Sequence, residues 1–333
     1  MREEKHTGPA TGVPAKPASR GGCTLPDDVG VTRRALLWLG ELPGAQDLVQ
    51  GLPISRHLVR RFVAGDTVVD ALDLIEDLNR AGVGGVLDEL GEGVRDLDQA
   101  ERASRDYDTA LDAVSRRGTD TTVAVKLTQL GLLVDPEGCV RRIGALCEKA
   151  ARLGIHLEID MEQSDVVDQT LQVYRQVAAS YRPPRLAVQA YLHRTPDDLR
   201  TLAPLKAPIR LVKGAYAEPE DQALQEPAEI SARYRELMEW LFDNHPDPAL
   251  GTHDGAMLGH AQLAARRRGL DRRSFEVQML YGVRRELQLE LARSGHRVRV
   301  YVPFGSAWYP YLVRRLAERP ANLRFFARSL VQG

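Results

Sequence analysis

Polar and charged residues interrupt the short apolar runs of this chain, most often near the point where a run ends. Lys126 lies within the run VAVKL, and Glu158 and Asp160 lie at the end of the run at 155–161. Comparable positions hold Gln189, Tyr191, Arg210, Lys213, Tyr216, Thr252, His253, Asp254, Glu276, Gln278 and Tyr301. Each buried polar group needs a partner, so this set exceeds what packing alone requires. These residues are the first candidates for catalysis or binding.

The segment that begins at Trp308 predicts a helix with one chemically active face. Tyr311, Arg314, Arg315 and Glu318 follow the spacing i, i+3, i+4 and i+7, so they share that face. Two adjacent arginines offer a fork of donors to a carboxylate or a phosphate. The alternative interpretation is an arginine face that only meets solvent.

Several of these residues also have structural interpretations. Lys126 could form a purely structural ion pair with Asp160 or Glu158. Thr252 and His253 could be a strand terminus or half of a metal site, and Glu158 with Asp160 could hold a cation. The sequence lacks the further clustered ligands that a zinc site needs, so no metal is predicted.

Eight short apolar runs supply the elements that would position these residues. Their richness in branched and aromatic residues is typical of strands buried on both faces of a parallel sheet. They span residues 83–90, 122–130, 155–161, 185–191, 209–216, 249–254, 274–280 and 297–304. Helical patterns separate them, and one is predicted to begin with Thr195 as N-cap and Pro196 at the first helical position.

This alternation predicts an α/β fold, a (βα)8 barrel of the TIM type, whose catalytic residues come from the C-terminal ends of the strands. A doubly wound sheet is the alternative. It would normally carry a glycine fingerprint after its first strand, whereas Gly82, Gly84 and Gly85 stand at the start of one.

The N-terminal part of the chain differs from this pattern. Residues 1–28 are rich in Gly, Pro, Thr and Ala without an apolar period, which predicts a disordered tail. Residues 29–81 carry helical patterns and are predicted to form an N-terminal helical arm. The barrel is then expected to occupy residues 82–333.

Composition excludes several classes of protein. The 333 residues include 45 Lys and Arg against 46 Asp and Glu, a net charge of -1, so a basic nucleic-acid-binding face is not expected. Three cysteines fit neither a disulfide framework nor a zinc motif and agree with a cytoplasmic protein. No apolar stretch approaches the roughly 18 residues of a membrane span, and no signal peptide is recognised.

Residues 83–331 contain a series of motifs that resembles the proline dehydrogenase family. These motifs are VKL at 125–127, EID at 158–160, QAYLHR at 189–194, RLVKGAY at 210–216, THD at 252–254 and FEVQMLYG at 275–282, followed by YVPFG and WYPYLVRRLAERPAN near the C-terminus. The resemblance implies a distorted barrel whose last helix caps the active site.

The resemblance also implies an activity. Members of this family oxidise L-proline to Δ1-pyrroline-5-carboxylate with noncovalently bound FAD, which a membrane quinone reoxidises. This chain would then be a cytoplasmic enzyme that meets the inner face of the membrane to reach its quinone. The sequence leaves open whether it forms a homo-oligomer.

The family's functional residues can be carried over where the motifs match. Arg314, Arg315 and Lys126 match the residues that clasp the proline carboxylate. Asp160, Tyr216, Leu280 and Tyr301 match the rest of the pocket, and Arg210 matches the arginine beside the flavin N5. Asp160 and Arg210 are the expected catalytic residues, with either Asp160 or solvent as the acceptor of the proton from the substrate amine. The matches to cofactor contacts are Gln189, Lys213, Gly214, Ala215, Thr252, His253 and, less closely, Met161. Glu318 matches an acid that supports the pocket.

Three departures or alternatives accompany this interpretation. The chain is too short to include the aldehyde dehydrogenase domain of bifunctional relatives, so it resembles the monofunctional bacterial type. Tyr301 favours proline over hydroxyproline, because hydroxyproline-oxidising relatives tend to have a smaller residue there. A Schiff-base aldolase with Lys126 or Lys213 as nucleophile, or an amino-acid sensor, would also explain part of the pattern.

Overall fold

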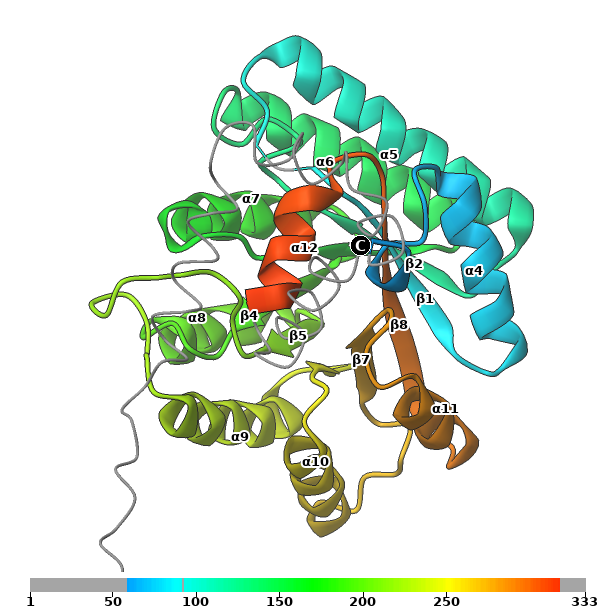
Figure 1. The fold of residues 1–333 in the computed structure, drawn as a ribbon. Helices are drawn as coiled ribbons and strands as arrows, with labels where there is room; N and C mark the ends of the chain where they lie inside the picture. Colours follow the sequence, from blue (N-terminus) through cyan, green and yellow to red (C-terminus); the bar gives the residue numbers. More distant parts are fainter. Residues whose placement is uncertain (1–58, 92, 318–333) are drawn as a thin grey trace, which may run out of the picture.

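In this computed structural model, eight parallel strands form a closed barrel (Figure 1). The structure describes residues 59–91 and 93–317. The strands are β1 (Gly84–Glu89), β2 (Thr121–Val125), β3 (His156–Ile159), β4 (Arg185–Gln189), β5 (Ile209–Val212), β6 (Ala249–Gly251), β7 (Glu276–Leu280) and β8 (Arg297–Phe304). Each strand pairs with the next in chain order, and β8 pairs with β1 to close the ring. The predicted (βα)8 barrel is confirmed.

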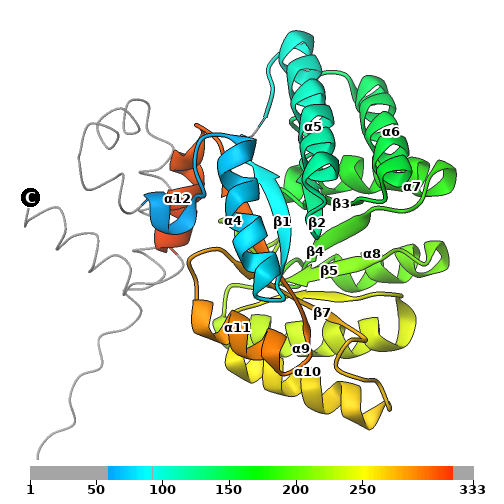
Figure 2. The same ribbon diagram turned by 90° about the vertical axis from the view of Figure 1, so that its right-hand side faces the viewer.

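Helices connect the successive strands and cover the outside of the barrel (Figure 2). They are α5 (Leu97–Arg117), α6 (Pro136–Leu153), α7 (Val167–Ser180), α8 (Thr195–Leu202), α9 (Pro227–Asn244), α10 (Gly255–Arg267) and α11 (Arg285–Arg293), with short 3-10 turns at Ser164–Val166 and Ala203–Leu205. Aspartates cap several of them, as Asp96 caps α5 and Asp135 caps α6. Their apolar faces pack on strands that are themselves largely buried.

Helix α4 (Val68–Arg80) covers the seam where the barrel closes. It begins with a capping box between Thr67 and Asp70, and it buries Leu72 and Ile75. Its neighbours in the barrel are β1 and β8, so it occupies the outer position that a helix following β8 would otherwise take.

Helix α12 (Trp308–Ala317) follows β8 and lies across one end of the barrel instead of along its side (Figures 1 and 2). Its residues Trp308, Tyr309, Tyr311 and Leu312 form a small apolar cluster with Phe62, Val63 and Leu90. The predicted capping helix is therefore observed. Helix α12 packs against the segment before α4 and against the residue that follows β1.

The strands are shorter than several of the apolar runs that predicted them. The run at 122–130 contains a strand that ends at Val125, and the run at 209–216 contains one that ends at Val212. Lys126 and Lys213 therefore stand just beyond their strands. The reason is that the following residues, although buried or half-buried, turn away from the sheet around the barrel mouth.

The start of α8 also differs from the prediction. The helix begins at Thr195 itself, with Arg194 in the N-cap position, so Thr195 is not the N-cap. The Thr195 hydroxyl instead donates a 2.6 Å hydrogen bond to the carbonyl of Gln189. This bond joins the start of α8 to the end of β4, where the same carbonyl also accepts a 3.3 Å bond from the N–H of Leu192.

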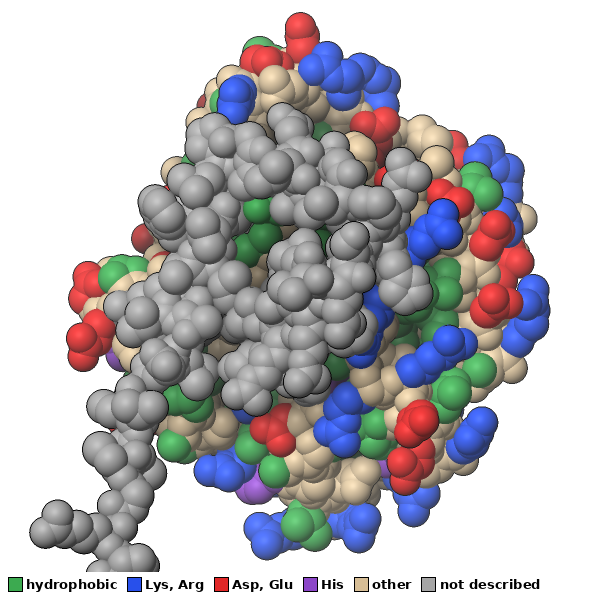
Figure 3. Space-filling view, in the orientation of Figure 1, with side chains coloured by type: hydrophobic (Ala, Val, Ile, Leu, Met, Phe, Trp, Pro, Cys, Tyr) green, Lys and Arg blue, Asp and Glu red, His purple; other side chains and the backbone are tan. Residues whose placement is uncertain are grey.

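The predicted tail at 1–28 and the part of the helical arm before residue 59 lie outside the described residues. Within 59–91 and 93–317, no helix is both long and apolar enough to cross a membrane. Acidic and basic side chains are interspersed around the face seen in Figure 3, which agrees with the near-zero net charge.

Candidate active site

A cavity of about 1160 Å³ lies at the C-terminal end of the barrel, against α12. It is larger than the roughly 300–1,000 Å³ of typical small-molecule pockets, so it has room for a large cofactor together with a substrate. The sequence-predicted residues that line it are Lys126, Asp160, Met161, Gln189, Tyr191, Arg210, Lys213, Gly214, Ala215, Tyr216, Thr252, His253, Asp254, Gln278, Leu280, Tyr301, Tyr311 and Arg315. The side chain of Arg314 and all of Glu318 lie outside the described part of the chain.

Lys126 is buried between two carboxylates. Its Nζ lies 2.5 Å from Oδ1 of Asp88 and 3.3 Å from Oδ2 of Asp160. Burial alone would lower the pKa of Lys126, but Asp88 in particular raises it well above its usual value. Lys126 is therefore a fixed positive charge. The ion pair expected with Asp160 is present, whereas the alternative partner Glu158 binds other groups.

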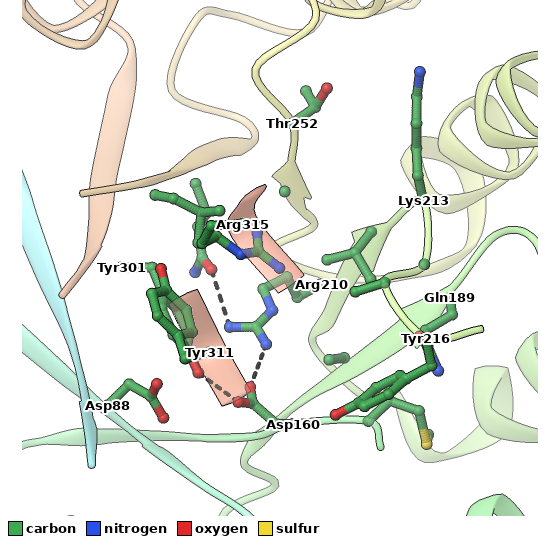
Figure 4. A pocket seen from close by; sticks show the side chains of 18 of the residues that line it. Asp88, Asp160, Gln189, Arg210, Lys213, Tyr216, Thr252, Tyr301, Tyr311 and Arg315 are labelled. Carbon is green, nitrogen blue, oxygen red and sulfur yellow. Dashed lines mark hydrogen bonds and ion pairs between the residues drawn. The ribbon is translucent and has the colours of Figure 1, made fainter. Parts of the chain in front are cut away.

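Asp160 joins three elements of the site (Figure 4). Its Oδ1 accepts a hydrogen bond from Nη2 of Arg210, and its Oδ2 accepts one from the hydroxyl of Tyr301. The Arg210 guanidinium lies over the Tyr301 ring, 5.2 Å from its centre. Burial would raise the pKa of Asp160, but Arg210 and Lys126 hold it below its usual value. Asp160 is thus a carboxylate with little tendency to take a proton.

A second polar layer lies beneath Arg210 inside the barrel. Oε2 of Glu158 accepts a 2.8 Å bond from Arg210 Nη1. Oε1 accepts a 2.8 Å bond from Arg185 and a 2.7 Å bond from the amide of Gln278. Glu158 is 1% exposed, so this pairing leaves its charge no contact with water. The layer fixes the direction in which the Arg210 guanidinium points.

The loops after β4 and β5 form another wall. The Gln189 amide donates a 2.9 Å bond to the carbonyl of Glu162, and Lys213 Nζ lies 3.1 Å from Oδ2 of Asp254. Gly214 has φ +121°, and a Cβ there would lie 2.3 Å from the ring of Tyr191. The glycine is therefore required by the neighbouring tyrosine, in addition to any ligand that approaches its backbone.

Thr252 and His253 follow β6. The ring Nε2 of His253 accepts a 2.7 Å bond from the backbone N–H of Leu280, and the Thr252 hydroxyl accepts one from the N–H of Asp254. Both side chains hold loops together at the cavity wall. Within the described ranges, no group of three His, Cys, Asp or Glu residues could hold a metal ion.

Helix α12 brings Tyr311 and Arg315 to the cavity. The Arg315 guanidinium lies 5.3 Å from the centre of the Tyr311 ring, which orients it by a cation–π contact. Figure 4 shows both side chains in the same pocket as Arg210, Asp160 and Tyr301. Positive charge therefore reaches the cavity both from the barrel and from the capping helix.

Comparisons with known proteins agree with this arrangement. The profile of the family described as Proline dehydrogenase matches residues 71–328. Proline dehydrogenase 1 of Bacillus subtilis is 34% identical over 84% of this chain and 92% of its own length. The proline dehydrogenase of Deinococcus radiodurans is 33% identical over 90% and 98%. This chain belongs to the proline dehydrogenase family.

A solved structure agrees in fold. Proline utilization A of Bdellovibrio bacteriovorus, inactivated by N-propargylglycine, superposes with a TM-score of 0.75 at 22% identity. The match covers 87% of this chain and 36% of that one. The resemblance to proline dehydrogenases that the motifs indicated is confirmed by the sequence comparisons, and the barrel by the structural one.

Among the cavity residues that the sequence did not predict are Asp88 and Arg284. Asp88 is the penultimate residue of β1, so the rule that catalytic side chains lie at the C-terminal ends of barrel strands would have found it. Arg284 follows β7 by four residues, and nothing in its local sequence distinguishes it from neighbouring arginines. The first had a usable signal and the second had none.

The Lys126–Asp88 contact predicts strong energetic coupling. We expect Asp88→Asn and Lys126→Met each to lower the free energy of unfolding by about 3–5 kcal/mol, because each leaves a buried charge without its partner. The double variant should lose at least about 2 kcal/mol less than the sum. Urea denaturation measures all three. The exposed pair Arg80 and Asp77 is the control, with a coupling below about 1 kcal/mol. Additivity at Asp88 and Lys126 would contradict the buried pair.

Glu89 predicts a pH dependence of stability. Burial, with help from Asp106 and Asp88, raises its pKa to about 7. Unfolding returns the pKa to about 4.5, so between these values the folded state holds the extra proton. The free energy of unfolding therefore falls as the pH rises from about 4.5 to 7, and it is level above that window.

We expect Glu89→Gln to flatten this slope and to stabilise the protein by about 1–2 kcal/mol at pH 8. Denaturation at pH 5, 6, 7 and 8 measures the effect. The exposed Glu290→Gln on α11 is the control and should keep the wild-type slope. An unchanged slope in Glu89→Gln would show that Glu89 ionises normally in the folded protein.

Proposed function

We propose that this chain oxidises L-proline to Δ1-pyrroline-5-carboxylate with noncovalently bound FAD and passes the electrons to a membrane quinone. The observation that carries the proposal is one cavity in which Arg315 of the capping helix faces Lys126, Asp160 and Arg210 of the barrel. The family membership supports the same substrate. The reaction is the first oxidation in proline breakdown.

The positive side chains fit the carboxylate of proline. Arg315 can donate two parallel hydrogen bonds, and its partner in the motif, Arg314, is assigned the same role from the family match. Lys126 Nζ has three donors, of which Asp88 and Asp160 take two. Holding the substrate carboxylate in this way fixes its ring in one position and lowers the entropic cost of the reaction.

Tyr301, Leu280 and Tyr216 would surround the five-membered ring of the substrate. Tyr301 is bonded to Asp160, so its aromatic ring stands as a fixed wall, with Leu280 and Tyr216 also lining the cavity. A fixed tyrosine leaves little room for a hydroxyl on the substrate ring, which favours proline over hydroxyproline. Because the pKa of Asp160 is lowered, we assign it to orienting Arg210 and Tyr301, and the proton of the substrate amine to solvent.

The cavity fits FAD in size and in chemistry. The buried Nε of Arg210 has no hydrogen-bond partner among the described residues, which leaves a donor at the cavity wall for a polar ring edge. Gln189, Lys213 and the backbone of Gly214 and Ala215 would hold the cofactor along one side, with Met161, Thr252 and His253 around it. When bound, FAD supplies the acceptor for the hydride that leaves the substrate.

The remaining parts of the proposal concern the cellular setting. We place the enzyme in the cytoplasm, in peripheral contact with the membrane that holds its quinone. The net charge of -1 offers no support for nucleic-acid binding, and acidic and basic side chains are interspersed on the face shown in Figure 3. The family relatives support the monofunctional type, since the match covers nearly their whole length.

The Schiff-base alternative fits less well. A nucleophilic lysine must lose its proton, but two carboxylates keep Lys126 charged. Lys213 is held by Asp254 and Ser231 at the cavity wall. A Schiff-base mechanism at either lysine also leaves unexplained why Arg315 of α12 lines the same cavity.

Turnover tests the proposed function directly. The purified protein should be yellow, release FAD to the supernatant on acid precipitation, and reduce an artificial acceptor when L-proline is added. The product should react with o-aminobenzaldehyde, which traps the cyclic imine. A colourless protein that forms a borohydride-reducible adduct with a ketone would support the aldolase and overturn the proposal.

Arg315→Met tests the carboxylate clasp. We expect a higher KM for proline and a loss of about 2–4 kcal/mol in kcat/KM, because the variant removes a charge-assisted contact shared by the bound substrate and the transition state. FAD content should stay near that of the wild type. Arg293→Met, on the exposed end of α11, is the control. If kcat/KM stays within about twofold in Arg315→Met, α12 does not contribute to substrate binding.

A further inference from the structure

Arg284 has a backbone conformation that disfavours its own residue type. It lies between β7 and α11 with φ +50° and ψ +47°, in the left-handed region that glycine adopts more readily. It also occupies the N-cap position of α11 without a capping side-chain bond, where Ser, Thr, Asp or Asn would be better. Neither the backbone conformation nor helix capping therefore favours an arginine at position 284. The reason for an arginine must lie in the contacts of its side chain.

That side chain reaches across to the loop after β6. Its Nη1 donates a 2.7 Å hydrogen bond to the carbonyl of His253, and it lies 3.7 Å from the point where a Cβ on Gly255 would stand. The two loops are joined again where Leu280 donates to the His253 ring. Arg284 thus lines the cavity beside Thr252 and His253, the segment assigned above to the cofactor.

Arg284 differs in its ion pairing from three other cations of the cavity, and it shares with Arg95, which also lines the cavity, the lack of a carboxylate partner among the described residues. Lys126 and Arg210 are paired with buried carboxylates, and Lys213 is paired with Asp254. Within the described ranges, Arg284 has no carboxylate within 4.0 Å, and its bond to His253 uses one of five donors. A planar fork of unused donors with an uncompensated charge is suited to the oxygens of a phosphate.

We propose that Arg284 binds the diphosphate of the dinucleotide cofactor at the mouth of the cavity. The inference rests on the proposed function, because it takes the ligand to be FAD. Arg210 is 7% exposed and lies deep in the cavity, whereas Arg284 is exposed at its edge. Because Arg284 is hydrogen-bonded to the His253 carbonyl, a cofactor held at one end by Arg210 and at the other by Thr252 and His253 would bring its phosphates within reach of Arg284. The same side chain joins the β6 and β7 loops around the ligand.

Arg284→Gly is a sharp test, because glycine accepts the left-handed backbone and removes only the side chain. The matched control is Arg285→Gly, since Arg285 is also exposed but does not line the cavity. The full chain is stripped of cofactor and titrated with FAD, ADP, FMN and riboflavin by fluorescence or calorimetry. These probes separate the diphosphate from the flavin ring. Thermal melting of each variant checks the fold.

We expect Arg284→Gly to melt within a few degrees of the wild type and to bind FAD and ADP about 10–100-fold more weakly. Riboflavin affinity should stay within about twofold. FAD affinity of the wild type and of Arg285→Gly should fall with added salt more steeply than that of Arg284→Gly, because an exposed ion pair is screened.

Two outcomes would overturn the inference. Equal FAD and ADP affinity in Arg284→Gly and the wild type would show that the side chain does not meet the diphosphate. A similar loss for riboflavin and FAD would show that Arg284 only braces the His253 loop. If the wild type bound no flavin at all, the proposed function itself would fail, and that result is visible before any variant is compared.

Discussion

The carboxylate of Glu158 is the contact on which the interior of this barrel depends. It lies on β3 and accepts hydrogen bonds from Arg185 on β4, Arg210 on β5 and Gln278 on β7. A buried charge is tolerated only when it is paired and hydrogen-bonded. Arg185 and Gln278 also donate hydrogen bonds to Glu276, so the network of buried charges extends to a second carboxylate. The barrel is filled here by alternating charges where aliphatic layers are usual.

This charged interior reaches the candidate site without a break. Arg210 forms ion pairs with both Glu158 and Asp160. Asp160 contacts Tyr301 and Lys126, and Lys126 forms a further ion pair with Asp88 on β1. Each member is held by the next, so the floor of the cavity is oriented before any ligand arrives. Such preorganised charge is the form of electrostatic support that enzymes use most effectively. The capping helix then needs only to bring Arg315 to a surface already in place.

Much of this arrangement could be predicted from the sequence, whereas the pairing of charges across the barrel could not. The apolar runs predicted the barrel. The polar residues Lys126 and Asp160 were predicted to share one site because the C-terminal ends of barrel strands meet at one face. Which charge faces which across the barrel depends on register and stagger between strands, and the sequence does not encode these locally. The alternative partner Glu158 proposed for Lys126 was therefore wrong. Asp88 was missed for a different reason, because its position near the end of β1 was a local signal that was not used.

The closure of the ring by β8 has a consequence for how the chain reaches its fold. Strand β8 pairs with β1, for example at Val300 and Gly85, and these are the last and the first strands of the barrel in the sequence. Arg299, also on β8, donates hydrogen bonds to Glu276 and to Asp120. Until this strand emerges from the ribosome, β1 keeps an open edge and the acidic groups lack one of their cations. Such long-range pairing is slow to form. The nascent chain therefore keeps one edge of β1 unpaired until residues 297–304 have been synthesised, and an unpaired strand edge of this kind promotes aggregation.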